Sequence, residues 1–469
     1  MVGVHSIEVS SMKYISTRGG VSGLSFSEAV MMGLATDGGL LLPDSIPQVS
    51  SQLGDWQGLS YSELAAQVIA PYVDDISKTD LASLISQSYA SFDHASVSPL
   101  VEVGNVHVLE LFHGPTLAFK DIALQLLGNL FGHVLSGTSA KLNILGATSG
   151  DTGSAAIAGL RGRPGINTFI MFPDGRTSPV QELQMTTVLD KNVFNIAIDG
   201  SFDDCQSLLK TVFNDLQFKS RYNLGAVNSV NWARVLAQIV YYFSAWYQLQ
   251  RPSEFDVAVP TGNFGNIFAG FIAKQMGLPI RKLILATNSN DILARFFNSG
   301  IYQKGSVHFS ESPAMDIQIA SNFERLLFYH LGQDSQQVGQ FMTDFHTTGL
   351  ARVPGCTGIM EYFDAGSVND ADTLQGIKKC YQDYSYLADP HTAVGICRAE
   401  QVLEPGVPMV CLATAHPAKF EAAVHKAMPS IVPRHAALEN LHGLETRKFK
   451  LPASDDHLRA FIGEHCPDC

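Results

Sequence analysis

The sequence predicts an α/β fold built on a largely parallel β-sheet. Beyond about residue 100, short apolar stretches alternate with Gly-rich turns and with amphipathic stretches of helical period. This alternation is typical of βα units. The chain has 469 residues, of which 46% are hydrophobic and 16% are charged. A chain of this length and composition contains enough apolar material for two or three domains.

Residues 12 to about 100 form a first region that precedes the alternation. It carries a turn-rich stretch between Ala35 and Pro43, followed by helical patterns such as the one that begins at Tyr61. The first residues lack the apolar core of a signal peptide. Since the sequence also has no apolar run of transmembrane length, we expect a cytoplasmic protein that does not associate with membranes.

The charge and the cysteines exclude several functions. A net charge of −13 and a pI near 5.5 argue against nucleic acid as a partner, although they leave room for a small anionic substrate. Seven scattered cysteines predict a reduced protein rather than a disulfide scaffold. We interpret the C-x-x-C spacing of Cys466 and Cys469 as a frayed tail, and we expect no metal site.

Three strand–turn–helix units are the clearest of the alternating elements. Their turns are Ser149–Gly153, Thr261–Asn266 and the segment that follows Thr414. Because the carboxyl ends of parallel strands meet at one rim of a sheet, and ligands bind there, we expect these turns to converge on one site. Residues 300 to 390 mix helical patterns with polar stretches. We expect them to form helices that pack on the main domain, and we assign them no chemical role.

The second turn is the best candidate for binding an anion. It reads Gly262-Asn263-Phe264-Gly265-Asn266. Its glycines allow backbone amides to approach a ligand, and the following helix points its N–H groups and positive dipole end at the same place. The loop is neither a Walker A sequence nor G-x-G-x-x-G. The alternative is an ordinary strand-to-helix turn in which Asn caps the helix.

The other two turns offer hydroxyl groups and one acid. Ser149, Asp151 and Thr152 lie in a small polar turn, but Asp151 or Thr152 has an alternative role as the cap of the next helix. Thr414 ends an almost wholly apolar strand. Its hydroxyl is either bonded to neighbouring backbone or presented to a ligand at the end of the strand.

Two cations complete the set of candidate residues. Lys120 follows an apolar stretch and directly precedes a helical pattern. A desolvated amine there is able to form a Schiff base near neutral pH, whereas the alternative is a lysine in the first turn of a surface helix. Arg234 follows Asn228 and Asn231 in a short span before an apolar helix. It suits a phosphate through its planar fork, and the alternative is a solvated arginine.

Taken in order, these segments resemble threonine synthases. The most specific segments are HGPTLAFKD at 113–121, ATSGDTG at 147–153, TGNFGN at 261–266 and DPHTAVG at 389–395. The resemblance extends over most of the chain. The long N-terminal region resembles the microbial and fungal branch of the family.

The resemblance implies a fold and a reaction. The fold is tryptophan-synthase-β-like, or fold type II, in which two parallel-sheet α/β domains enclose pyridoxal 5′-phosphate. We expect an N-terminal domain at 1–100, a larger cofactor-binding domain at 101–140 and 225–469, and a smaller domain at 141–224. The reaction converts O-phospho-L-homoserine and water to L-threonine and phosphate. We expect a monomer or a homodimer.

The resemblance also implies a role for each candidate residue. Lys120 carries the cofactor, residues 262–266 hold its phosphate, and Thr414 bonds the pyridine nitrogen. Asp151 lies close to the cofactor, and whether it touches the ring oxygen is left open. Arg234, Ser149 and Thr152 are the candidates for the substrate phosphate.

Three other functions are compatible with these segments. One is another lyase of the same cofactor group, either a dehydratase or a phospho-lyase that acts on phosphohomoserine. The second is a protein that binds the cofactor without catalysis. The third is a phosphate-binding α/β protein with no cofactor.

Overall fold

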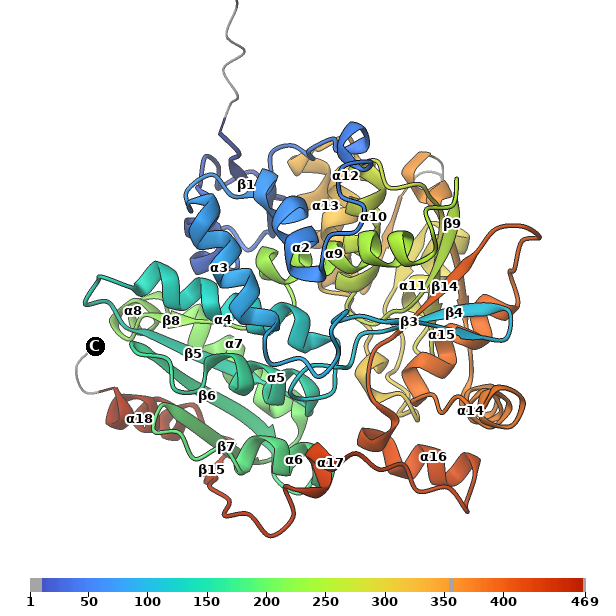
Figure 1. The fold of residues 1–469 in the computed structure, drawn as a ribbon. Helices are drawn as coiled ribbons and strands as arrows, with labels where there is room; N and C mark the ends of the chain where they lie inside the picture. The colour runs from blue at the N-terminus through green and yellow to red at the C-terminus, as the bar shows by residue number, and fades with distance from the viewer. Residues whose placement is uncertain (1–10, 354–357, 467–469) are drawn as a thin grey trace, which may run out of the picture.

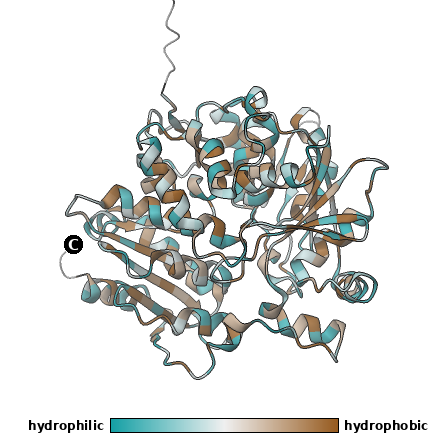
Figure 2. Cartoon of the chain, viewed as in Figure 1, coloured by the Kyte–Doolittle hydropathy of each residue, from teal (hydrophilic) through white to brown (hydrophobic). Residues whose placement is uncertain are grey.

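Two separate sheets form the cores of two α/β domains, and an N-terminal region packs on the larger domain (Figure 1). The computed structural model describes residues 11–353 and 358–466. The predicted fold class is confirmed, because the sheets are mostly parallel and helices cover them. Figure 2 shows that the strands of both sheets are largely hydrophobic along their length, as strands buried on both faces must be.

The larger sheet has six strands. Its order is β13 (Phe363–Ser367), β10 (Ile280–Thr287), β9 (Phe255–Pro260), β14 (Met409–Ala413), β4 (Val106–Glu110) and β3 (Leu100–Val103). Only the edge pair β3–β4 is antiparallel. Because β9 and β14 are neighbours, Thr261 and Thr414 leave the sheet side by side at its carboxyl edge.

The smaller sheet has five parallel strands. Its order is β15 (Phe449–Pro452), β7 (Val193–Asp199), β6 (Ile166–Pro173), β5 (Leu142–Ala147) and β8 (Leu224–Gly225). The strand β15 pairs in parallel with β7, with Phe449 opposite Ile196. The predicted range 225–469 had placed this strand in the larger domain, and for β15 that prediction is wrong. The rest of the predicted division into domains stays a prediction.

Two further expectations are wrong. The three turns do not share one rim, because β5 lies in the smaller sheet while β9 and β14 lie in the larger one. The segment 300–390 is not only helical. It contributes β13 to the larger sheet and forms an antiparallel pair of β11 (Ile301–Gln303) with β12 (Leu350–Arg352).

The N-terminal region is a small antiparallel strand pair followed by short helices. Its elements are β1 (Tyr14–Ser16), α1 (Phe26–Met32), β2 (Leu41–Pro43), η1 (Ser50–Gln52), α2 (Tyr61–Ile69), η2 (Ala70–Tyr72) and α3 (Lys78–Tyr89). Ser25 and Ser60 begin α1 and α2 as capping boxes, in which each serine accepts from the backbone N–H of a glutamate three residues on. These caps fix where the helices start.

A second group of helices comprises α4 (Lys120–Leu135), α9 (Trp232–Gln248), α10 (Gly265–Gln275), α11 (Ile292–Ser299), η3 (Pro313–Met315), α12 (Phe323–His330), α13 (Ser335–Thr348), η4 (Gly358–Tyr362), α14 (Asp370–Tyr384), α15 (Pro390–Glu400), η5 (Pro417–Phe420) and α16 (Glu421–Ala427). Of these, α10, α11 and α15 pack directly on the larger sheet, whereas α4 packs on α3 and α9. Helix α9 packs on α10, α4 and α2, so the N-terminal region is joined to the helices that carry the site.

The remaining helices belong to the smaller sheet or lead to it. They are α5 (Asp151–Leu160), α6 (Pro179–Thr186), α7 (Phe202–Asn214), α8 (Leu216–Arg221), α17 (Ala436–Glu439) and α18 (Asp455–His465). In Figure 1 the chain between α16 and β15 crosses below both domains. Helix α4 packs against α5, and this contact brings the two domains together at Lys120.

The interpretation of the C-terminal C-x-x-C segment as a frayed tail is wrong for its first cysteine. Cys466 is buried, and its Sγ donates to Asn143 Oδ1 at 3.1 Å, while Cys469 lies outside the described residues. Cys205, Cys380 and Cys411 are free thiols. None of the helices in the described ranges is both long and apolar enough to cross a membrane.

Replacing Arg325 with methionine is expected to lower the free energy of unfolding by about 3 kcal/mol. Arg325 is fully buried, and its guanidinium donates to Leu41 O, at 2.8 and 3.1 Å, and to Val230 O and Asn322 Oδ1. The variant leaves these buried acceptors without their donor. Urea unfolding followed by circular dichroism measures the change.

The control for this prediction is Arg295→Met. Arg295 is a partly exposed arginine that pairs with Asp291 one helical turn away and donates to Gln303 O at 3.0 Å. Its loss is expected to cost less than about 1 kcal/mol. Equal losses in the two variants would show that Arg325 contributes no more than a surface ion pair.

Candidate active site

Lys120 is the first residue of α4 and lies beside the end of β14. The preceding backbone is bound to the segment after that strand, because Phe119 N donates to Thr414 O at 2.9 Å and Ala118 forms an antiparallel bridge with Ala415. Helix α4 is buried over most of its length, and the Lys120 side chain is only 12% exposed. The alternative of a lysine on a surface helix is therefore excluded.

The amine of Lys120 contacts a carboxylate that follows a strand of the smaller sheet. Lys120 Nζ lies 3.2 Å from Asp151 Oδ2, and Asp151 begins α5 of the smaller domain. The other carboxylate oxygen, Oδ1, accepts from Lys419 Nζ at 2.9 Å and from Gln181 Nε2 at 2.7 Å. Two predicted residues thus meet although they follow strands of different sheets.

These neighbours shift the pKa values of both groups. Burial lowers the pKa of Lys120, Asp151 partly opposes this, and the cations Lys419 and Arg234 add to it. Burial alone raises the pKa of Asp151, but Lys120 and Lys419 outweigh that effect and hold it well below its usual range. The result is an ionised carboxylate beside an amine that loses its proton more easily than a surface lysine does. Such an amine is a good nucleophile toward an aldehyde.

Thr148, not Asp151 or Thr152, caps helix α5. Its Oγ1 accepts from Gly150 N at 3.0 Å and from Gly153 N at 2.9 Å. Gly150 has φ +152°, and a Cβ there would lie 2.5 Å from the Gln181 side chain, so glycine is required. Because Thr148 satisfies the amides, Asp151 is left to bind the two lysines. The alternative prediction of an Asp151 or Thr152 cap is wrong.

The loop 262–266 combines an exposed side chain, Asn263, with the buried ring of Phe264. Phe264 has φ +65° and ends the loop in the left-handed conformation. Its ring packs among Phe297, Phe323 and Phe363. No side chain in the described part of the chain caps the first turn of α10. The first N–H groups of this helix thus have no side-chain partner there, and the binding of an anion by them stays a prediction.

Asn263 and Asn266 are held in place by polar contacts behind the loop. Asn263 O accepts from the backbone N–H of Asn322 at 3.0 Å and from its side chain at 3.1 Å. Asn266 Oδ1 accepts from the hydroxyls of Tyr241 and Tyr242, whereas its buried Nδ2 has no partner among the described residues. These contacts hold the loop against α9 and α12.

Thr414 is positioned by the start of α15. Its backbone N–H donates to Thr392 Oγ1 at 3.2 Å. Asp389 caps α15 by accepting from the backbone N–H of His391 and Thr392. His391 Nδ1 lies 2.7 Å from Asp389, and its Nε2 accepts from Ala314 N at 3.2 Å. Ala314 lies against Gly262, so these contacts connect the Thr414 strand end to the anion-binding loop.

Arg234 is a buried cation with few partners. Its Nη1 donates to Val227 O at 3.2 Å, and its Nε has no partner among the described residues. Burial lowers its pKa to about 10, and its charge acts on Lys120. The alternative of a solvated arginine is excluded. Asn231 caps α9 by accepting a hydrogen bond from Ala233 N, as the alternative of a helix N-terminus in this segment predicts.

Ser149 and Thr152 lie on either side of Asp151 in the chain. Ser149 is exposed and Thr152 is half-buried. Among the described residues, no hydrogen bond joins either side chain to Arg234. The structure therefore brings these hydroxyls beside Asp151, and their binding role stays a prediction.

Sequence reasoning missed Lys419, Gln181 and Thr148. Lys419 had a signal, since it is a lone lysine five residues after Thr414 in the third strand–turn–helix unit. Gln181 had none, because its contact with Asp151 depends on the packing of α6 against α5.

The charges of the site favour anionic ligands. Lys120 and Lys419 contact the carboxylate of Asp151, and the charge of Arg234 acts on Lys120. Burial raises the pKa of Asp121 to about 6. A buried excess of positive charge is costly unless a ligand compensates it. Together with the open amides of α10, this site fits an anionic aldehyde and a second anion.

The fold and this site together indicate the class of protein to which the chain belongs. A buried lysine lies beside the end of β14, and helix α10, whose first turn no described side chain caps, follows the neighbouring strand β9. Residues 93–343 match the family model of pyridoxal-phosphate-dependent enzymes. The chain is therefore a pyridoxal-phosphate-dependent enzyme of fold type II.

The comparisons with individual proteins are more specific. Residues 13–89 and 392–462 match the models for the N-terminal and C-terminal parts of threonine synthase. The chain is 47% identical to threonine synthase of Pseudomonas aeruginosa over 97% of this chain and 98% of that protein. It is 44% identical to threonine synthase of Saccharomyces cerevisiae over 94% and 95%, respectively. The chain belongs to the threonine synthase family.

Solved structures agree with this assignment. The pyridoxal-phosphate-bound threonine synthase of Brucella melitensis superposes with a TM-score of 0.93 at 44% identity, over 97% of this chain and all of that one. The yeast threonine synthase gives 0.92 at 42% identity, over 98% and 99%.

Proposed function

We propose that the protein converts O-phospho-L-homoserine and water to L-threonine and phosphate. The observation that carries the proposal is the buried Lys120 amine, held by Asp151 inside a site with an excess of positive charge. A substrate phosphate and a cofactor phosphate would compensate that charge. When bound, pyridoxal phosphate supplies an electron sink that acidifies the substrate α-carbon.

Lys120 is proposed as the attachment point of the cofactor and as the base of the reaction. With cofactor and substrate bound, its amine would take the α-proton of the substrate, release that proton to the bound ligands, and then take the β-proton. Its lowered pKa supports this role, because a base must be partly unprotonated near neutral pH. The contact with Asp151 from the other domain limits water around the amine.

The remaining residues are proposed to bind the two ligands. Residues 262–266 would hold the cofactor phosphate through the uncapped amides of α10, and the Thr414 hydroxyl would form a hydrogen bond with the pyridine nitrogen. Asp151 would lie close to the cofactor because it contacts Lys120. Arg234, with Ser149 and Thr152, binds the substrate phosphate. The unpartnered Nε of Arg234 and its burial beside Lys120 support this assignment.

Product analysis tests the proposed function. The purified protein with its cofactor is incubated with O-phospho-L-homoserine, and amino acids, keto acids and phosphate are quantified. We expect threonine and phosphate in equal amounts. α-Ketobutyrate in place of threonine would instead indicate a dehydratase or phospho-lyase. Retained cofactor without release of phosphate would indicate a binding protein.

Assembly and location are also proposals. We propose a monomer or a homodimer, which light scattering of the purified protein distinguishes. We propose a cytoplasmic protein, since buried free thiols such as Cys205 and Cys411 suit a reducing compartment.

A further inference from the structure

Lys419 is a fully buried lysine next to the site. It lies in η5, and its side chain has no exposed surface. Its ammonium group has two acceptors, Asp151 Oδ1 at 2.9 Å and the backbone oxygen of Thr116 at 2.6 Å. A buried ammonium ion persists only where such partners compensate its lost hydration.

The partners of Lys419 come from both sides of the domain boundary. Asp151 belongs to α5 of the smaller domain, whereas Thr116 lies in the segment that leads to Lys120. Lys120 and Lys419 approach different oxygens of the Asp151 carboxylate. The carboxylate is therefore fixed at both ends and is unable to rotate without breaking one contact.

We infer that Lys419 is a positioning residue whose ammonium group holds the Asp151 carboxylate toward Lys120 and adds a second positive charge beside the Lys120 amine. The inference rests on the proposed role of Lys120. When Lys120 uses its nitrogen for the cofactor, Lys419 remains as the counter-ion of Asp151. The buried carboxylate thus keeps a cationic partner throughout the reaction.

The direction of the electrostatic effect follows from the groups that face Lys120. These are Asp151 on α5, Lys419 on η5 and Arg234 on α9, with Asp121 on its own helix. Lys419 and Arg234 disfavour a proton on Lys120, and Asp151 favours one. Neutralising Lys419 therefore raises the proton affinity of the Lys120 nitrogen, and neutralising Asp151 lowers it.

The test is a pH titration of the holoenzyme without substrate. The absorbance of the lysine-bound cofactor is recorded at each pH, and the midpoint is the pH at which half of the absorbance change has occurred. In Lys419→Met the midpoint is expected to move up by about 1 pH unit. In Asp151→Asn it is expected to move down. Lys419→Arg, which keeps the charge, is expected to bring the midpoint back toward that of the wild type. A folded Lys419→Met variant that titrates like the wild type would overturn the inference.

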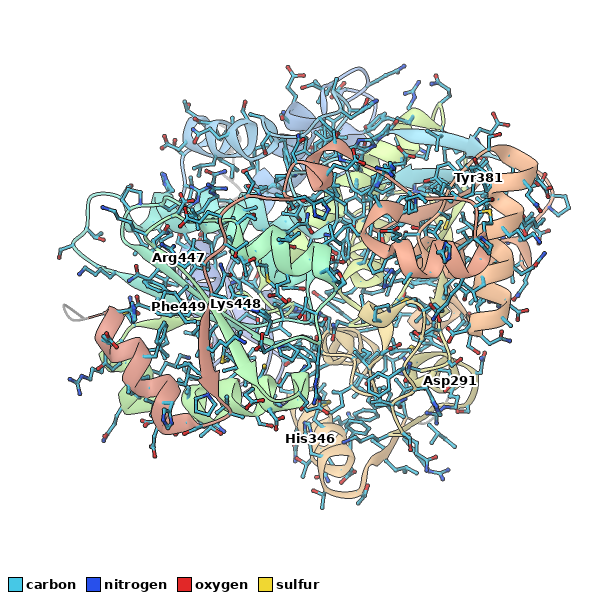
Figure 3. The ribbon with its side chains drawn as sticks, turned by 90° about the horizontal axis from the view of Figure 1, so that it is seen from below. Asp291, His346, Tyr381, Arg447, Lys448 and Phe449 are labelled. Carbon is cyan, nitrogen blue, oxygen red and sulfur yellow. The ribbon has the colours of Figure 1, made fainter. Side chains whose placement is uncertain are left out.

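A matched control separates this effect from loss of any lysine ion pair. Lys448 bridges Asp174 and Glu182 at 2.9 and 2.7 Å in the segment labelled in Figure 3, without contact to Asp151. Lys448→Met is expected to leave the midpoint unchanged. An equal shift in this variant would assign the effect to general destabilisation and overturn the inference.

A second neutral variant covers the case in which the methionine variant does not fold. Lys419→Gln keeps an N–H donor for Asp151 and Thr116 but removes the charge, and the same upward shift is expected. An unshifted midpoint there also overturns the inference. Because no substrate is present in the titration, its outcome is independent of the product analysis that tests the proposed function.

Discussion

Lys120→Ala is expected to abolish covalent attachment of pyridoxal phosphate and to lower kcat at least about 1000-fold. The variant removes both the nitrogen that binds the cofactor and the base that moves the substrate protons. Asp151 keeps Lys419 as a partner at 2.9 Å, so the fold is expected to survive. The absorbance of the lysine-bound cofactor and the initial rate of phosphate release measure the two effects.

The control for this prediction is Lys450→Ala. Lys450 is 69% exposed and pairs with Asp174 at the surface of the smaller domain. We expect its absorbance and rate to match those of the wild type. A Lys120→Ala protein that keeps the lysine-bound absorbance band would show that another amine carries the cofactor.

Arg234→Ala is expected to raise KM for O-phospho-L-homoserine about 100-fold while the cofactor stays bound. Arg234 is buried, and its Nε is without a partner among the described residues, so the guanidinium retains donors for a phosphate. Initial rates over a range of substrate concentrations give KM, and the cofactor absorbance reports occupancy. Arg234→Lys is not expected to restore KM, because an ammonium ion lacks the planar fork.

The contrast with Arg325 makes this prediction specific. Arg325 donates to Leu41, Val230 and Asn322 and stabilises the fold, whereas Arg234 donates only to Val227 among the described residues. Arg234→Ala is therefore expected to cost much less stability than Arg325→Met. Loss of cofactor with an unchanged KM would show that Arg234 serves the cofactor instead.

Local features of the sequence were enough to identify the strand ends and turns of the site. Lys120, the loop 262–266 and Thr414 lie at junctions between apolar strands and helices, and such junctions depend on neighbouring residues. The sequence does not show which residue caps α5, because Thr148, Asp151 and Thr152 compete for the same backbone amides. Tertiary contacts decide the competition, since two lysines attract Asp151 and leave the amides to Thr148.

Contacts between the domains were beyond the reach of sequence reasoning. The approach of Lys419 to Asp151 joins two helices that follow strands of different sheets, and no periodicity in the sequence shows which helix faces which. The strand β15 illustrates the same limit. Its alternation of Phe449 and Leu451 with Lys450 is typical of an edge strand, but the alternation does not say which edge it joins.

The pairing of β15 with β7 has a consequence for biosynthesis. The other strands of the smaller sheet lie between Leu142 and Gly225, so most of that domain leaves the ribosome long before its last strand does. Until Phe449–Pro452 arrive, β7 keeps an unpaired edge, and exposed edges recruit strands from other chains. A nascent or prematurely terminated chain is thus most vulnerable to aggregation at β7.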